Sequence, residues 1–236
     1  GLVASPIKNL SQLEQAICNC KKCPRLVKWT RDIAQEKRKS YENETYWGKP
    51  VPGFGSKKPK LLVVGLAPGA HGANRTGRIF TGDRSGEWLF RAMHKAGFAN
   101  QAQSINKKDG LKLTQARVIT AVRCAPPDNK PTIKERDTCN KWMDLEWKFI
   151  EKDLKVVIAL GSFAWKAAID ILLEQGFEVK IKEKFSHGAK SVYRKQKHEI
   201  TLLGSYHPSQ QNTFTGRLTE VMLDQVFGTA SKLIKT

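Results

Sequence analysis

The chain has 236 residues, and its 41 Lys and Arg against 22 Asp and Glu give a formal net charge of +19 at pH 7. Hydrophobic residues make up 40% of the chain, which is enough for a buried core and excludes wholesale disorder. The excess of cations favours a nucleic-acid partner over an anionic membrane or a merely basic surface, and neither a membrane-spanning run nor a signal peptide is evident.

The N-terminal part of the chain predicts little regular structure before the first strand. A short helix within residues 1–30 leads into a cysteine cluster, and the charged, turn-rich stretch 31–59 predicts an ordered loop. Residues 60–66 form an unbroken apolar run, which is typical of a strand covered on both faces. A Gly-rich loop over 67–82 follows, and apolar residues on one face predict a helix over 86–96.

The middle of the chain predicts a second strand and a well-marked helix. Residues 99–115 are polar and predict a loop, and residues 116–122 predict a strand. A Pro-rich loop then ends at Thr132, which has capping-box spacing to Glu135 and predicts a helix that reaches about residue 152.

The C-terminal part predicts two further strands and two helices. A strand is expected over 156–160, with Ser162 as the cap of the following helix, and another strand over 199–204. The last helix is expected over 218–234, whereas residues 178–198 are ambiguous.

Strands thus alternate with helices four times, which is typical of a parallel sheet with helices on both faces. We therefore expect one α/β domain over residues 1–236. Three loops follow predicted strands, at 67–83, 123–131 and 205–217. Because ligands in such folds bind beyond the C-terminal ends of the strands, these loops are expected to converge on one rim that carries the site.

Four of the five cysteines have spacing that suits a metal centre. Cys20 and Cys23 form a C-x2-C pair, and Cys124 and Cys139 supply a remote second pair. Four thiolates can enclose zinc or a [4Fe–4S] cluster, and the spacing of the cysteines does not distinguish the two. The alternative is a set of unrelated buried thiols. Cys18 is expected to be the odd one out, although it could replace Cys20. Such a centre would have a structural role, because it ties distant segments together.

The loop after the first strand lacks both the phosphate-loop and the dinucleotide-binding patterns, which disfavours ATP and NAD sites. Its glycines allow a ligand to approach the backbone closely. Phe80 is a candidate for stacking on a planar base, with plain core packing as the alternative. Asp83 precedes a predicted helix, so an N-terminal cap is the alternative to a functional carboxylate.

Three segments, 65–83, 122–131 and 205–217, resemble the motifs of the uracil-DNA glycosylase superfamily, most closely its family five, the B-type enzymes of thermophilic archaea and bacteria. The C-x2-C pair and the stretch 46–55 also match, so the resemblance covers nearly the whole chain in the same order. It implies an α/β/α three-layer sandwich around a parallel sheet of about four strands. The implied activity is base excision repair, with hydrolysis of the N-glycosidic bond of uracil, and of other deaminated bases such as hypoxanthine, in single- or double-stranded DNA.

The resemblance also implies roles for individual residues. It assigns a [4Fe–4S] cluster, with zinc as the alternative, to a ligand set in the N-terminal segment 1–59 and the middle of the chain, namely Cys20, Cys23, Cys124 and Cys139. His207 would donate a hydrogen bond to the uracil carbonyl, Asp83 would favour the cationic sugar and orient the attacking water, and Asn129 would help to hold that water.

Five further residues are candidates for binding the substrate. They are Ala67, Gly69, Ala70, Phe80 and Arg217, the last for a phosphate contact. Other families carry a catalytic Asp, Asn or Glu near the place of Ala70, and family four has a uracil-reading Asn where this chain has Thr120. A wider, less selective pocket is therefore expected.

Two rival functions remain open at this stage. A non-catalytic nucleic-acid-binding module with a structural zinc would account for the charge and the cysteines. A hydrolase of small nucleotides would account for the Gly-rich loop. The expected protein is otherwise a monomer that acts on DNA in the cytoplasm, near the nucleoid, without a membrane.

Overall fold

A seven-stranded mixed sheet forms the centre of the computed structural model, which describes residues 6–236. The strand order is β1-β3-β2-β4-β7-β6-β5. The strands are β1 (Phe54–Gly55), β2 (Leu61–Gly65), β3 (Ala116–Thr120), β4 (Val156–Leu160), β5 (Glu178–Val179), β6 (Lys190–Lys195) and β7 (His198–Ser205).

The four central strands β3, β2, β4 and β7 are parallel, which confirms the predicted sheet and its four strands. The antiparallel strands β1, β5 and β6 extend the sheet on both sides and were not predicted. β1 and β5 have only two residues each, and β6 alternates buried and exposed residues among charged ones. None of the three therefore has the apolar run that marks a strand.

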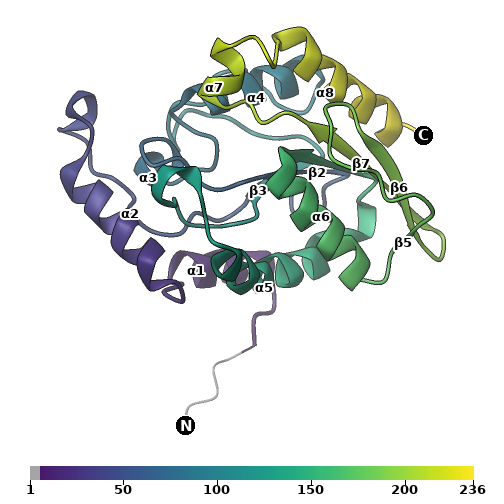
Figure 1. Cartoon of the computed structure of the whole chain (residues 1–236), viewed down its shortest axis with the longest axis horizontal. Coiled ribbons are helices and arrows are strands. Elements are labelled where there is room, and N and C mark those ends of the chain that lie inside the picture. Colours follow the sequence, from purple (N-terminus) through teal and green to yellow (C-terminus); the bar gives the residue numbers. More distant parts are fainter. Residues whose placement is uncertain (1–5) are drawn as a thin grey trace.

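Helices cover both faces of the sheet, as Figure 1 shows. They are α1 (Leu10–Cys18), α2 (Pro24–Glu36), α3 (Ala73–Thr76), α4 (Arg84–Lys95), α5 (Ile133–Ile150), α6 (Ser162–Glu174), α7 (Gln210–Phe214) and α8 (Glu220–Ile234). Three single turns of 3-10 helix lie at Lys39–Tyr41, Pro127–Asn129 and Glu151–Asp153.

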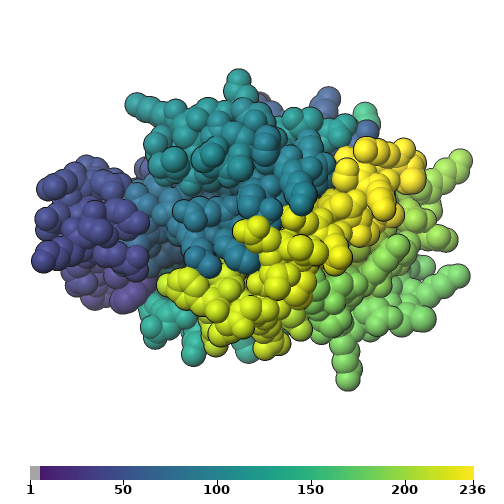
Figure 2. All heavy atoms as spheres, turned by 90° about the horizontal axis from the view of Figure 1, so that it is seen from above, coloured from purple at the N-terminus to yellow at the C-terminus, as the bar shows by residue number. Residues whose placement is uncertain are grey.

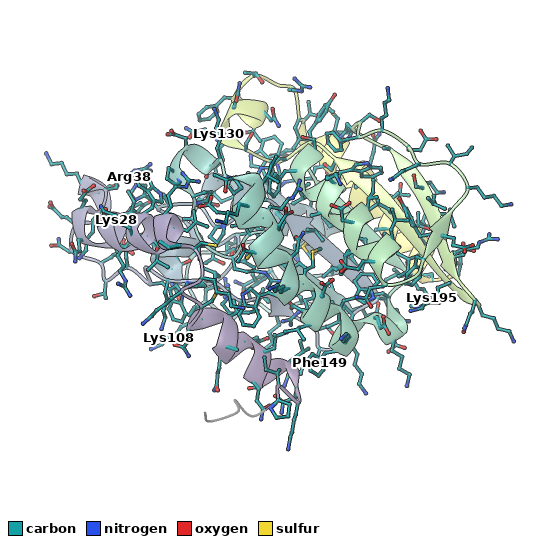
Figure 3. The ribbon with its side chains drawn as sticks, turned by 60° about the horizontal axis from the view of Figure 1, so that its bottom comes forward. Lys28, Arg38, Lys108, Lys130, Phe149 and Lys195 are labelled. Carbon is teal, nitrogen blue, oxygen red and sulfur yellow. The ribbon has the colours of Figure 1, made fainter. Side chains whose placement is uncertain are left out.

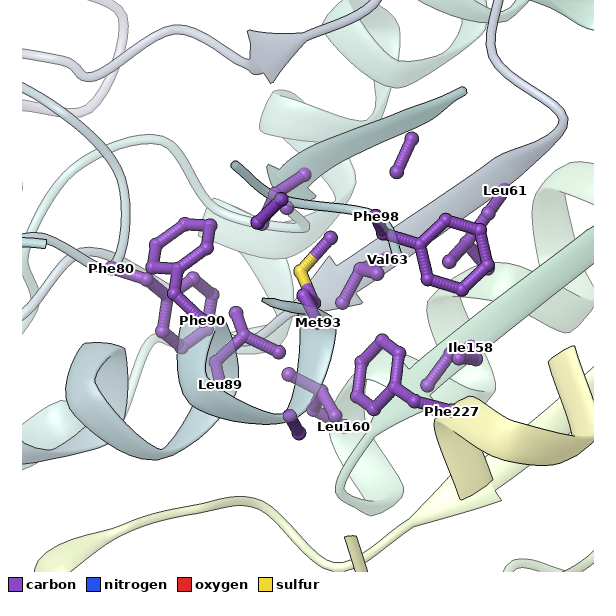
Figure 4. Close-up of a cluster of buried hydrophobic side chains, with 14 of the residues drawn as sticks. Leu61, Val63, Phe80, Leu89, Phe90, Met93, Phe98, Ile158, Leu160 and Phe227 are labelled. Atoms are coloured by element: carbon purple, nitrogen blue, oxygen red, sulfur yellow. The ribbon is translucent and has the colours of Figure 1, made fainter. Parts of the chain in front are cut away.

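Alternate residues of β2 face two separate cores, because successive side chains of a strand point to opposite faces. Leu61 and Val63 pack against α4 and α8, where Figure 4 shows them among Leu89, Met93 and Phe227. Leu62 and Val64 pack instead against α1, α5 and α6. The expected three layers, helices on both sides of a parallel-centred sheet, are thus present.

Several helix boundaries differ from the sequence prediction. The N-terminal region holds two helices, and α2 continues through residues 31–36, which were expected to be a loop; residues 1–5 lie outside the described residues. Pro24 occupies the first turn of α2, where its missing N–H costs nothing. The predicted capping box of Thr132 and Glu135 is present. Gly161, with φ +90°, rather than Ser162, caps α6.

No helix among residues 6–236 is both long and apolar enough to cross a membrane. Basic side chains project from opposite ends of the molecule, Lys28 and Arg38 at one end and Lys195 at the other (Figure 3). The positive charge is therefore not confined to one rim, and the position of a ligand must be fixed by the loops at the site.

Candidate active site

A cavity of about 730 Å³ opens at the C-terminal ends of the parallel strands. Its walls come from the segments 66–87, 126–129 and 207–210, which confirms that the three predicted loops converge on one rim. Trp29, Arg38 and Tyr41 complete the wall from the N-terminal part of the chain. In Figure 2 the purple N-terminal lobe and the yellow-green C-terminal segment flank the blue part of the chain between them.

Arg75 holds the first loop in shape from within. Its Nε donates to the carbonyl of His71 at 2.6 Å and its Nη2 to that of Gly82 at 2.8 Å. Nη1 forms an ion pair with Glu44 at 2.7 Å, and the guanidinium lies over the ring of Tyr41. One buried side chain thus joins the two ends of the loop that carries the candidate residues. An arginine in a loop gives no signal of burial in the sequence, so this role of Arg75 could not be predicted.

Phe80 lies at the floor of the cavity in an unusual conformation. Its backbone has φ +50°, in the left-handed region that residues other than glycine rarely adopt. Its ring lies against Gly65, where an added Cβ would come within 2.6 Å of Cζ. The ring centroid is 6.0 Å from that of His207. The structure therefore fits both interpretations of Phe80, since the ring is 5% exposed in the core and also lines the cavity.

Asp83 caps a helix, one of the two alternatives that the sequence left open, and also lines the cavity. Its Oδ1 accepts a hydrogen bond from the backbone N–H of Gly86 at 2.9 Å and caps α4. Its Oδ2 faces the loop backbone, since an added Cβ would lie 2.9 Å from it at Gly69 and 2.1 Å at Gly72. Burial raises the pKa of Asp83, although the Gly86 N–H and Arg75 counteract the shift.

His207 follows β7 and points its ring at the same cavity. Burial lowers its pKa to about 4, so the imidazole is neutral at neutral pH. The side chain of Asn212 donates to the carbonyl of His207 at 2.9 Å, and Ser209 caps the short helix α7. A neutral ring held by its backbone in this way is a hydrogen-bond donor that carries no charge of its own.

The other candidates divide between the cavity and its surroundings. Asn129 lines the cavity from the exposed 3-10 turn and has φ +55°. Ala67, Gly69 and Ala70 lie in the wall of the first loop. Arg217 does not line the cavity; it is exposed and its guanidinium lies 4.7 Å from the centroid of the Tyr206 ring.

His71 of the first loop also forms part of the cavity wall. The Nδ1 of His71 lies 2.8 Å from the hydroxyl of Tyr46, which is 7% exposed. That hydroxyl accepts the backbone N–H of Arg38 at 3.2 Å. The sequence shows only that residues 46 and 71 are 25 positions apart, which does not predict a contact between them.

Four cysteines line a second, smaller cavity. They are Cys20, Cys23, Cys124 and Cys139, together with Trp142 and Leu26, whereas Cys18 is not in its wall. Burial raises the pKa of Cys139 to about 11 and also raises that of Cys124. Within residues 6–236, no three His, Cys, Asp or Glu side chains converge on a point at the distances of a single metal ion.

A buried network of charges adjoins the cysteine cavity. Arg123 lines the cavity, is 1% exposed and pairs through Nη2 with Glu146 at 2.8 Å. Arg117 pairs with the same carboxylate at 2.6 Å and with Glu14 of α1 at 2.9 Å. Nε and Nη1 of Arg123 are buried and find no hydrogen-bond acceptor within residues 6–236. Two buried guanidiniums thus share one buried carboxylate beside four thiols.

Comparison with known proteins places these features in a family. A sequence profile described as "Uracil DNA glycosylase superfamily" matches residues 52–229. The chain is 48% identical over 225 residues to the type-5 uracil-DNA glycosylase of Mycobacterium tuberculosis, covering 95% of this chain and 82% of that protein. It is 43% identical over 219 residues to the type-5 enzyme of Thermus thermophilus, covering 93% and 95%. With the type-5 enzyme of Pyrobaculum aerophilum it shares 39% over 215 residues, covering 91% and 89%.

Proposed function

The chain belongs to the uracil-DNA glycosylase superfamily and, within it, to the type-5 uracil-DNA glycosylases, and from this premise we propose how its cavity carries out the reaction. The protein is a uracil-DNA glycosylase of base excision repair. Because a base stacked in a duplex is out of reach, the nucleotide rotates out of the helix and its base enters the 730 Å³ cavity.

Breaking the bond between base and sugar separates two charges, a cationic sugar and an anionic base. We assign Asp83 to the sugar side. Its Oδ1 is committed to the cap of α4, which leaves Oδ2, directed at Gly69 and Gly72, to orient a water molecule and to stabilise the positive sugar. The hydrogen bond of the cap also holds the Asp83 side chain in one position, so the carboxylate needs little reorganisation during the reaction.

We assign His207 to the base side. A neutral imidazole donates one N–H to a base oxygen as negative charge accumulates there, and burial keeps the ring neutral. Phe80 offers its ring to the extruded base, with Ala67, Gly69 and Ala70 as the small residues that leave room for it. Asn129, which also lines the cavity, is assigned to the attacking water, and Arg217, outside the cavity, to a phosphate of the flanking strand.

The small residues of the first loop support a broad range of bases. Ala70 carries no functional group, so the cavity wall at that place excludes no particular base edge. We propose that hypoxanthine is excised as well as uracil, from both single- and double-stranded DNA. We also propose that residues 1–236 act as one domain and as a monomer on DNA in the cytoplasm.

The cysteine cavity suits a [4Fe–4S] cluster. Four thiols from two distant parts of the chain line it, and thiolate is the ligand that such clusters take. Nε and Nη1 of Arg123 find no acceptor among the described residues, and an anionic, sulfur-rich group beside them would supply acceptors. When bound, the cluster would tie the N-terminal segment to the loop after β3 and to α5 through four iron–thiolate bonds.

The central test is uracil release from DNA. The protein is incubated with an oligonucleotide that contains one uracil, free uracil is quantified, and abasic sites are cleaved with alkali. Release by the wild-type chain but by neither Asp83→Asn nor His207→Ala supports the assignments. Equal release by the variants contradicts them, and activity on dUMP without activity on DNA points to a hydrolase of small nucleotides. Visible absorption near 400 nm with stoichiometric iron identifies the cluster, whereas a colourless protein with one zinc rejects it.

A further inference from the structure

A chain of two hydrogen bonds fixes the direction in which the His71 ring donates. The backbone N–H of Arg38 can only donate, so the Tyr46 hydroxyl oxygen accepts it at 3.2 Å. The single proton of that hydroxyl is then available for the neighbour at 2.8 Å, which is Nδ1 of His71. If Nδ1 donated instead, the hydroxyl proton would have no acceptor within residues 6–236, so Nδ1 is assigned as the acceptor and the proton of the neutral ring is placed on Nε2.

The surroundings of His71 keep the ring neutral and in place. Burial, followed by the nearby cations Arg38 and Arg75, lowers its pKa. Arg75 also holds the backbone carbonyl of His71 at 2.6 Å, and the Tyr46 side chain is buried. The ring makes its only hydrogen bond within residues 6–236 through Nδ1, although His71 forms part of the cavity wall. Nε2–H is thus the polar edge of the ring that remains for a ligand.

Deamination changes one feature of a base in a consistent way. Cytosine becomes uracil and adenine becomes hypoxanthine, and each time an exocyclic amino group is replaced by a carbonyl oxygen. An amino group presents N–H donors, whereas a carbonyl presents acceptors. A protein group that can only donate therefore pairs with the damaged base and leaves two donors facing each other with the normal base.

We propose that His71 is a specificity-determining residue whose locked Nε2–H donates to the carbonyl oxygen that deamination creates, at position 4 of uracil and position 6 of hypoxanthine. The inference rests on the proposed glycosylase reaction and extends it. Tyr46 acts as a positioning residue, since its hydroxyl selects the tautomer but does not touch the base. With uracil, His207 serves the other carbonyl, at position 2, so the two imidazoles divide the two oxygens of that base between them.

Sulfur substitution distinguishes the two carbonyls of uracil, because a thiocarbonyl is a weaker acceptor. Single-turnover excision is measured on oligonucleotides with uracil, 2-thiouracil or 4-thiouracil, for wild type, His71→Ala, Tyr46→Phe and the control His94→Gln. His94 lies in α4 and its Nδ1 contacts the carbonyl of Ala99, away from the cavity.

In the wild type we expect uracil to be preferred over 4-thiouracil, and His71→Ala to reduce that preference by about 5- to 10-fold, the worth of one hydrogen bond. The preference for uracil over 2-thiouracil should stay unchanged in that variant. Tyr46→Phe should also reduce the preference for uracil over 4-thiouracil. Nitrogen NMR should show a single Nε2–H tautomer of His71 in the wild type and a mixture of tautomers in Tyr46→Phe.

A uniform loss of rate on all three bases in His71→Ala, with unchanged ratios, would overturn the inference and give His71 a structural or water-holding role. An Nδ1–H tautomer in the wild type would do the same. Absence of uracil excision by the wild type is a separate result, which rejects the proposed function itself. His94→Gln should match the wild type in every ratio.

Discussion

The carboxylate of Asp83 caps α4 through a 2.9 Å hydrogen bond from the backbone N–H of Gly86, while its second oxygen faces the loop that lines the cavity. One side chain therefore both begins a helix and, in the proposed mechanism, serves the reaction. The position of this carboxylate is set by the backbone of α4, which in turn packs through Leu89 and Phe90 into the core. The sheet thereby fixes the geometry of the site.

Replacing Asp83 by Asn should separate catalysis from stability. Asn caps helices as well as Asp does, so α4 should begin at the same residue. Uracil excision should fall by about 10²- to 10⁴-fold, the usual contribution of a positioned acid or base. The melting temperature should stay the same or rise. A variant that unfolds at a clearly lower temperature than the wild type would show that the charge itself holds the helix.

The higher melting temperature expected for Asp83→Asn follows from the raised pKa of Asp83. Between its ordinary pKa of 3.8 and the raised value, the folded state binds more protons than the unfolded state, so stability falls as pH increases through that window. At neutral pH the folded protein therefore carries the cost of a buried charge. The rate should also decline below the raised pKa, and this acid limb should be checked in a pH–rate profile of single-turnover excision.

His207 should affect stability in the opposite direction. Its pKa of about 4 lies below the usual 6.5, so the unfolded state binds more protons between these values and stability is lost as pH falls from 6.5 towards 4. His207→Asn should remove part of this loss, which thermal melts at pH 7 and pH 5 would measure. If wild type and variant lose the same stability between the two pH values, the ring is not buried as a neutral group.

A methyl group at residue 72 should disturb the carboxylate of Asp83. In Gly72→Ala the added Cβ would come within 2.1 Å of Oδ2 of Asp83, so the loop or the carboxylate must shift. Excision should fall at least tenfold, since displacement of about 1 Å at a reacting group can cost 10²-fold. Gly228→Ala is the matched control: it lies in α8 with nothing within 4 Å of the added atom, and should stabilise the helix by about 0.5–1 kcal/mol without changing activity.

The cysteines should divide into four that matter for the cluster and one that does not. Cys20→Ala and Cys139→Ala each remove a thiol from the cavity wall and should lower the iron content and the melting temperature. Cys18→Ala should retain full iron, because Cys18 lies outside that wall. Iron content per chain and absorption near 400 nm are the measurements. Loss of iron in Cys18→Ala would mean that the ligand set includes Cys18.

Removal of the carboxylate between Arg117 and Arg123 should be costly. In Glu146→Ala the buried Arg123 loses its counter-charge and Arg117 keeps only its pair with Glu14, and breaking a buried pair costs about 3–5 kcal/mol. Glu199→Ala breaks the exposed pair with Arg194 and should cost less than about 1 kcal/mol. Urea unfolding of both variants tests the difference, and equal costs would show that the buried network is only weakly coupled to the fold.

The parts of the fold that could be predicted are those with a local signal. The apolar runs of β2, β3, β4 and β7 and the capping box of Thr132 are visible in the sequence, and all are present. The antiparallel strands β1, β5 and β6 were missed because they are strands only through pairing with a neighbour, as β6 pairs with β7. The three loops could be placed on one rim because a parallel sheet brings strand ends together.

The side-chain partners inside the site could not be predicted in the same way. Arg75 joins residues 71 and 82 only once the loop has folded, and Tyr46 meets His71 from a segment with no regular structure of its own. A helix cap and a functional carboxylate were alternatives for Asp83, yet a carboxylate has two oxygens: Oδ1 caps α4, while Oδ2 lies near Gly69 and Gly72. Spacing along a chain cannot reveal such a division.

The two cavities draw on different lengths of the chain, and this orders their appearance during translation. Every residue in the wall of the cysteine cavity lies before position 143, whereas the larger cavity needs His207, Ser209 and Gln210. On the ribosome the four thiols therefore emerge while β7 and α8 have yet to be made. Metal delivery to the nascent chain could begin before any surface able to hold a nucleobase exists.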